Sequence, residues 1–473
     1  MSRNIELAKN TLIIAMGRFS SQLISLILLP LYTFYLSPAE VGLIDLIVTY
    51  VALLVPVLTI QLEMAVFRHL VDARNNEEEI KQVISNTIQV VALTSVLALF
   101  ISSILAVLFD IKYAYIIIFI VLGSMISNLF MQIARGLGDN KRFTIASVFS
   151  SIVMLLGISA LVVYGKNGAS GVLISMALAN FASAVYLFIK LKLYNYIRLF
   201  KGNRKLKKQL INYSLPLVPN GISWWIISVS DRTIITISLG LAANGIYAIS
   251  TKYVMIYMSI FAIFSLALTE SASLHIDKKD SEKFLSNANT SSIKIFGSLG
   301  LILIAIAPII FKLFVGSDFQ QAIQYVPILI LASFCNAIVL IYSAIYVAKK
   351  MTKQVATTSI MAAGINIVLT LGFIKILGIY AAAIATFIAY AAMAVYRHYD
   401  TKKYIKITYE KNLILKIGFS YASVIVLFYI GTTLTIAINI VLAAIITVLF
   451  NRHTINSIKN ITLDKLNSLK KNK

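Results

Sequence analysis

The apolar stretch at residues 11–32 is long enough to span a bilayer, yet it carries Arg18 about two helical turns from its start. Ser21, Gln22 and Ser25 follow at i+3, i+4 and i+7, so all four side chains share one face of a helix. A guanidinium group suits phosphate because it offers several N–H donors in a fixed fork. This pattern predicts a water-filled cleft in which Arg18, Gln22 and Ser25 bind an anionic group.

A second polar stripe lies in the apolar segment at 213–237. Its members recur every four residues on one helical face: Asn220, Trp224, Ser228, Arg232 and Thr236. We expect Asn220, Trp224 and Arg232 to line the same cleft. Because Trp224 and Trp225 are adjacent, only one of them can stack on a sugar from this face, and the other must pack against lipid or protein. Lys252, seven residues after Gly245, is a further candidate cation.

Four acidic residues lie in or at the ends of apolar segments and are candidates for coupling transport to H⁺ or Na⁺: Asp45, Glu63, Asp231 and Glu270. For each acid the alternative role is structural pairing with a neighbouring helix. Asp231 adjoins Arg232 but points about 100° away on a helix, so it need not neutralise its neighbour. For Arg18 and Arg232 the alternative is that each long side chain reaches a membrane surface.

The composition of the chain indicates that these helices lie in a membrane. Hydrophobic residues make up 59 % of the chain, charged residues make up 13 %, and the mean hydropathy is +0.86. A bilayer core needs about 20 apolar residues per helix. The chain offers fourteen such segments: 11–35, 41–62, 83–108, 113–132, 143–164, 170–189, 213–237, 245–268, 293–314, 323–347, 355–376, 378–395, 414–431 and 433–450. We expect an all-α polytopic membrane protein whose first helix is retained, because that segment lacks the short apolar region and cleavage site of a signal peptide.

The basic residues predict the orientation of these helices. With both termini in the cytoplasm, four of the 42 Lys and Arg residues lie in spans: Arg18, Arg232, Lys252 and Lys294. Four more lie outside: Lys112, Lys166, Lys312 and Lys375. The other 34 are cytoplasmic, as the positive-inside rule requires. The net charge of +23 therefore reflects topology and contact with anionic lipids, and nucleic acid is not an expected partner.

Internal repeats predict two lobes. The pattern L-x-x-A-x-x-G occurs at 36–42 and again at 239–245, an offset of 203, and ASAVY and AMAVY lie 210 residues apart. Two similar six-helix lobes of the same orientation would be related by an axis along the membrane normal. We expect the organisation to be an N-terminal lobe at 1–190, a basic cytoplasmic linker at 191–212, a C-terminal lobe at 213–396, helices 13 and 14 at 397–450, and a basic amphipathic tail at 451–473.

Several classes of function are disfavoured. The outside loops, such as SPAE, DIK and GKNGA, are too short to carry an extracytoplasmic catalytic domain, so we expect no enzyme. The single Cys335 excludes an internal disulfide, and the four histidines do not cluster. The phosphate-binding loop of ATPases is also missing. We therefore expect no metal site and no cofactor.

Four segments of the chain, together with its fourteen-helix outline, resemble the polysaccharide-transport (Wzx-type) flippases of the multidrug/oligosaccharidyl-lipid/polysaccharide (MOP) superfamily. They are GRFSSQLISLILLPLYTFYLSPAEVGLIDL, ARGLGDNKRFTIAS, NYSLPLVPNGISWW and SDRTIITISLGLAANGIYAIS. The resemblance implies a MATE-like fold, with two six-helix bundles in a V shape plus two C-terminal helices. Arg18, Asp231 and Arg232 match positions where such proteins are typically polar.

The resemblance also implies a function. Such proteins move undecaprenyl-pyrophosphate-linked oligosaccharide units across the bacterial cytoplasmic membrane by alternating access, for O-antigen, lipopolysaccharide, capsule or similar polymers. The implied partners are that lipid-linked oligosaccharide, membrane lipids, and the polysaccharide polymerase and chain-length machinery. Three alternatives stay open: a lipid II flippase, a MATE-like cation-coupled exporter of small molecules, and a membrane-embedded glycan polymerase or ligase. Acids would dominate the cleft of an exporter, and the short loops disfavour the polymerase or ligase.

Overall fold

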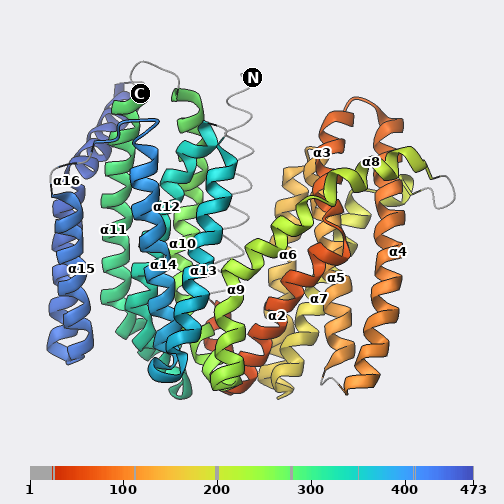
Figure 1. Ribbon diagram of the computed structural model, residues 1–473, viewed down its shortest axis with the longest axis horizontal. Coiled ribbons are helices and arrows are strands. Elements are labelled where there is room, and N and C mark those ends of the chain that lie inside the picture. The colour runs from red at the N-terminus through yellow and green to blue at the C-terminus, as the bar shows by residue number, and fades with distance from the viewer. Residues whose placement is uncertain are drawn as a thin grey trace. The chain divides into compact units, whose positions relative to one another are not determined.

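A computed structural model of the chain is built of long helices (Figure 1). It describes residues 24, 27–110, 113–197, 202–276, 281–349, 351–408, 410 and 412–471, and these ranges contain no strand. The chain divides into two compact units, residues 1–248 and 249–473. Because α9 and the first two turns of α10 belong to the first unit, its boundary lies beyond the basic linker at 191–212. The two repeat-based lobes stay a prediction.

The first unit contains eight labelled α-helices and the start of a ninth. They are α2 (Pro38–Leu58), α3 (Leu62–Ala73), α4 (Glu77–Phe109), α5 (Ala114–Gly136), α6 (Asn140–Ile158), α7 (Gly168–Lys190), α8 (Arg204–Ser214), α9 (Leu217–Leu239) and the first turns of α10 (Leu241–His275). A π-helical turn at Ser159–Tyr164 prolongs α6, and a 3₁₀ turn at Leu193–Asn195 follows α7. These helices carry the candidate site.

The second unit contains the rest of α10 and six further α-helices. They are α11 (Ser281–Phe314), α12 (Val326–Ala348), α13 (Thr352–Leu377), α14 (Ile379–Thr401), α15 (Leu413–Ile430) and α16 (Thr433–Lys471). A 3₁₀ segment at Ser317–Tyr325 precedes α12. The C-terminal tail is helical through Lys471, as its apolar periodicity predicts.

Twelve of the described helices are long and apolar enough to cross a membrane. Of the fourteen expected spans, 11–35 lies mostly outside the described residues. The span expected at 213–237 corresponds to α9, a helix of 23 residues that carries Asp231 and Arg232 and is not among these twelve. The all-helical membrane architecture is confirmed, and the count of fourteen stays a prediction.

Capping side chains determine where several helices begin. Ser37 and Glu40 form a capping box at α2: the Ser37 backbone N–H donates to Glu40 Oε2 (2.9 Å), and the Ser37 hydroxyl accepts from the Glu40 N–H (3.4 Å). The second oxygen of Glu40 accepts from the backbone N–H of Ala169 (3.0 Å), so one carboxylate joins the starts of α2 and α7. Asn76 caps α4 by accepting from the Glu79 N–H (3.2 Å), as the run NNEEE predicts.

A buried arginine ties together three helices of the second unit. Arg397 on α14 is 1 % exposed. Its Nε and Nη2 donate to the Thr358 hydroxyl of α13 (3.0 and 2.7 Å), and Nη2 also donates to the Val355 carbonyl (3.2 Å). Its Nη1 donates to the Val339 carbonyl (3.1 Å) and the Ser343 hydroxyl, both on α12. These neutral oxygens replace water around the guanidinium, which explains how the charge can be buried.

Replacing this arginine should destabilise the protein. Arg397→Ala leaves a cavity and unpaired oxygens, so we expect it to lower the free energy of unfolding by roughly 3 kcal/mol. Lys402→Ala, at an exposed position one turn further on, is the control, and it should change the free energy by less than about 0.5 kcal/mol. Unfolding of the purified protein in detergent micelles measures both. Equal stability of the two variants would contradict this account of the network.

Candidate functional site

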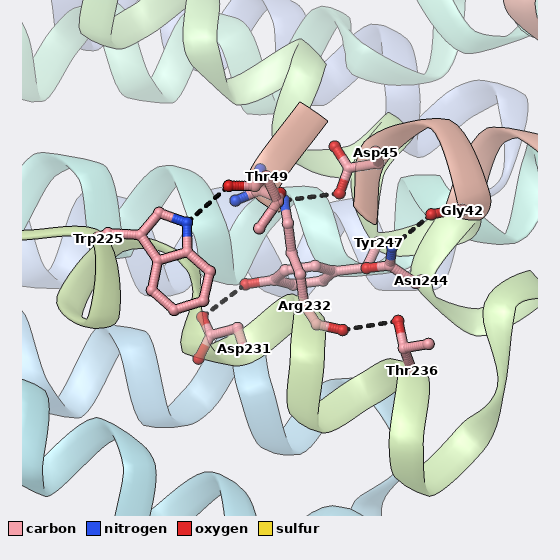
Figure 2. Close-up of polar contacts among 9 residues, drawn as sticks. All are labelled: Gly42, Asp45, Thr49, Trp225, Asp231, Arg232, Thr236, Asn244 and Tyr247. Atoms are coloured by element: carbon pink, nitrogen blue, oxygen red, sulfur yellow. Dashed lines mark hydrogen bonds and ion pairs between the residues drawn. The ribbon is translucent and has the colours of Figure 1, made fainter. Parts of the chain in front are cut away.

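An ion pair joins α2 to α9 in the first unit (Figure 2). Arg232 Nε lies 2.7 Å from Asp45 Oδ2, and each side chain is only 14 % exposed. A charge removed from water is costly unless an opposite charge or hydrogen bonds meet it. Asp45 therefore neutralises Arg232 from another helix.

Asp231 lies next to Arg232 in the sequence but reaches a different helix. Its Oδ2 accepts a hydrogen bond from the Tyr247 hydroxyl of α10 (3.1 Å) (Figure 2). Neighbouring side chains on a helix point about 100° apart, which is why the two charges find separate partners. As a result, α9 is tied to α2 on one side and to α10 on the other.

Trp225 extends the contact between α2 and α9. It lies two turns before Arg232 on the same face, and its indole Nε1 donates to the Thr49 carbonyl (2.6 Å). Its ring packs against Tyr50, with the ring centroids 5.6 Å apart. Thr49 is one turn after Asp45 on α2, whereas its partner Trp225 is two turns before Arg232 on α9. The two contacts therefore show that α2 and α9 run in opposite directions where they meet (Figure 2). Trp225 therefore packs against protein.

The two copies of L-x-x-A-x-x-G meet where α2 and α10 begin. A Cβ atom on Gly42 would lie 1.8 Å from the Leu241 carbonyl oxygen, and one on Gly245 would lie 1.9 Å from the Pro38 carbonyl oxygen. The repeat offset of 203 relates Gly42 to Gly245 and Pro38 to Leu241. Each glycine therefore faces the carbonyl of the residue that corresponds to the other's partner, and the contact is reciprocal. Asn244 Nδ2 donates to the Gly42 carbonyl (3.0 Å) (Figure 2). We call this contact of Pro38 and Gly42 with Leu241 and Gly245 the glycine crossing.

The start of α9 rests against a break between α2 and α3. Ile60 and Gln61 both adopt left-handed backbone angles, with φ of 53° and 51°, which are unfavourable for a β-branched residue such as isoleucine. The Gln61 Nε2 donates to the Leu217 carbonyl (2.9 Å). A Cβ atom on Gly221 would lie 2.3 Å from the same nitrogen. The break thus places Gln61 against the first turn of α9.

Glu63 lies beyond this break, at the start of α3. Its Oε2 accepts from the Thr59 hydroxyl (2.7 Å). Burial raises the pKa of Glu63, and the hydrogen bond from Thr59 partly offsets that rise. The structure therefore places Glu63 apart from the Asp45–Arg232 pair, at the other end of α2.

The remaining predicted residues are placed as follows. Lys252 is half-buried on α10 beyond residue 248, in the second unit. Arg18, Gln22 and Ser25 lie outside the described residues. Asn220 and Trp224 are on α9 and Glu270 is on α10, but their side chains also lie outside the described part of the chain. Of the predicted charges whose side chains are described, the structure brings together Asp45, Asp231 and Arg232.

Four residues at these contacts were missed by reasoning from the sequence. Thr49 accepts the hydrogen bond from Trp225 through its backbone carbonyl, and a pattern of side chains in the sequence cannot reveal such a contact. Tyr247 and Gln61 become partners of α9 only once the chain has folded. Asn244 stands beside the repeat glycine in LGLAANG, and as the one polar side chain in that segment it could have been found.

An apolar cavity of about 420 Å³ lies between α2, α4 and α5. Its lining includes Leu54, Leu97 and Val121. The two hydroxyls in its wall, Thr94 and Ser102, donate to backbone carbonyls of their own helix. This cavity suits hydrocarbon and offers no partner for a charged group. The polar contacts of α9 with α2 and α10 are therefore the candidate site.

The groups at this site are suited to binding. A guanidinium held by one carboxylate can take another oxyanion, such as a phosphate, in its place. The phenol, indole and amide groups nearby can orient polar ligands.

The fold matches those of known membrane transporters. The chain is similar to the structure titled lipid II flippase MurJ, inward closed conformation, with a TM-score of 0.70 and 19 % identity over 94 % of this chain and 100 % of that one. It is also similar to the inward-facing conformation of a multidrug resistance MATE family transporter of the MOP superfamily (TM-score 0.68, 14 % identity, 82 % and 97 % covered). The outward-facing conformation of such a transporter gives a TM-score of 0.56 at 16 % identity, with 84 % and 95 % covered. These likenesses confirm the MATE-like fold.

Sequence comparison assigns the family. No curated protein matches the chain. The family described as Polysaccharide biosynthesis protein matches residues 7–269, which is more than half of the chain. This match agrees with the polysaccharide branch of the superfamily that the sequence segments resemble. The chain therefore belongs to the polysaccharide biosynthesis protein family.

Proposed function

We propose that the chain is a flippase that moves polyprenyl-pyrophosphate-linked oligosaccharide units across the cytoplasmic membrane by alternating access. Its family supports a role in polysaccharide biosynthesis, and its fold supports transport. The observation that carries the proposal is the ion pair between Arg232 of α9 and Asp45 of α2. Each side chain is only 14 % exposed, and α2 is long and apolar enough to cross a membrane. We propose that transport, and not bond making, is the activity of this chain.

The chemistry of the proposed substrate fits this ion pair. A pyrophosphate is a dense oxyanion that a guanidinium can bind through two N–H groups. If the substrate takes the place of Asp45, Arg232 exchanges one oxyanion for another and is never left buried without a partner. An undecaprenyl chain and an O-antigen or capsule repeat unit are the lipid and glycan that we propose.

Other residues complete the proposed site. Arg18, Gln22 and Ser25 would contact the pyrophosphate or glycan, as would three residues of α9 and α10: Asn220, Trp224 and Lys252. The four acids Asp45, Glu63, Asp231 and Glu270 are our candidates for ion coupling. Glu63 is supported by its raised pKa, which brings its protonation closer to neutral pH.

We propose that both termini are cytoplasmic and that the membrane is the bacterial inner membrane. The basic residues in and just after α3 and those at the start of α8 support this orientation under the positive-inside rule. The second candidate function is lipid II flipping, which the nearly complete overlap with that flippase structure favours. Both substrates carry a polyprenyl pyrophosphate, so both would use Arg232.

Loss of the protein should distinguish these functions. In a strain that lacks it, we expect glycan-linked polyprenyl pyrophosphate to accumulate on the cytoplasmic side and surface polysaccharide to fall at least tenfold. Extracted lipids and surface polymer are measured in the same cells, and the gene restored in trans is the control. Accumulation of lipid II would instead support the second function. If neither lipid accumulated, the flippase proposal would be wrong.

Neutralising the ion pair should distinguish binding from folding. Arg232→Gln should reduce surface polysaccharide at least tenfold per unit of membrane protein, whereas Asp45→Asn, which keeps the cation, should retain part of the activity. If the pair only stabilised the fold, the double variant Asp45→Asn/Arg232→Gln would recover function because neither charge is left unpaired. We expect it to be inactive at normal expression. Arg204→Gln, on the exposed side of α8, is the matched control.

A further inference from the structure

The glycine crossing brings two helix backbones into contact. The carbonyl oxygens that face Gly42 and Gly245 belong to the backbone, so they cannot swing aside as the end of a side chain could. Any side chain at either position must push α2 and α10 apart. Such close approach of helices in a membrane is typical of glycine, and the glycine Cα–H groups here point at the opposing oxygens. The contact is therefore tight but made of weak interactions.

The contact lies directly beside the Asp45–Arg232 pair. Asp45 is three residues after Gly42 on α2, and Asn244 and Tyr247 are on the turns of α10 that form the crossing. The amide of Asn244 holds the crossing at the Gly42 carbonyl, while Tyr247 binds Asp231. Opening the crossing would thus disturb the contacts that hold α9.

The charge pattern indicates the side of the membrane on which the crossing lies. Residues 33–44 and 236–248 contain no Lys or Arg. The opposite ends of these elements lead into basic segments, with Arg68 and Arg74 on or just after α3 and RKLKK at the start of α8. Under the positive-inside rule the crossing lies on the outer side of the ion pair.

We infer that the glycine crossing is the outer closure of the candidate site: a backbone-to-backbone seal between α2 and α10 that separates when the site opens outward. Two glycines at repeat-related positions allow the seal to form without interlocked side chains, so it can open and re-form. The closure does not depend on what is transported. Only its role in releasing a glycan rests on the proposed function.

A thiol reporter tests this closure. Thr49→Cys in a Cys335→Ser background places a thiol at a site that is 5 % exposed, one turn beyond Asp45. In intact cells an impermeant thiol reagent should label it slowly. Adding Gly42→Ala or Gly245→Ala should raise the labelling rate at least tenfold, because each methyl group forces the helices apart.

Matched controls are available in the same chain. Gly364 and Gly372 on α13 have no atom within 4 Å of an added Cβ, so alanine there should leave the labelling rate unchanged. Two further variants show that the reagent reaches only the outer side of the membrane. Asn167→Cys, in a loop predicted to lie outside, should be labelled, and Lys208→Cys, in the predicted cytoplasmic segment, should not be. Asn244→Ala adds no bulk and should raise the rate about twofold to threefold by removing one hydrogen bond. This variant decides the question if the alanine variants do not fold.

Equal labelling of the crossing variants and the α13 controls would overturn the closure. Faster labelling only from the cytoplasmic side, in inverted vesicles, would also overturn it. Surface polysaccharide is not part of this readout. A confirmed closure in a protein whose loss leaves polysaccharide unchanged would therefore refute the proposed substrate alone.

Discussion

A charge that packing removes from water needs a partner, and the contacts of α9 with α2 and with the start of α10 meet this need. Arg232 meets it through Asp45 on α2, and Asp231 meets it through Tyr247 on α10. Because the two charges are neighbours on α9, they hold that helix between two others. The indole of Trp225 and the amide of Asn244 add polar contacts on the same helices.

Among the described residues, Arg397 and Arg232 are both largely removed from water, but their partners differ, and this difference distinguishes a structural contact from a candidate binding group. Arg397 is enclosed by hydroxyl and carbonyl oxygens of two helices, and it is 1 % exposed. Such a site has no room for a ligand and stabilises one packing. Arg232 is held by a carboxylate that another oxyanion can replace, and its side chain keeps 14 % exposure. The same residue type thus serves as a structural link in one unit and as a candidate binding group in the other.

The sequence predicts much of this fold because its signals are local. Apolar length predicts the spanning helices, NNEEE predicts the start of α4, and the spacing of Asp231 and Arg232 predicts that they point apart. The partner of Arg232 was not predictable, since Asp45 lies 187 residues away and only tertiary packing brings it close. The break at Ile60 and Gln61 was also missed, because two left-handed residues without glycine oppose local preference. The repeated glycines were found as a pattern, but their mutual contact appears only in the folded chain.

Movement of a lipid-linked glycan by the purified protein is the most direct test of this account. Liposomes containing the protein and a polyprenyl-pyrophosphate oligosaccharide would be treated with an impermeant glycosidase, and the rate at which protected glycan becomes accessible would be measured. The account predicts a rate at least tenfold above that of protein-free liposomes, which falls to the protein-free rate with Arg232→Gln. A rate that is the same with and without the protein, or one that Arg232→Gln leaves unchanged, would contradict it.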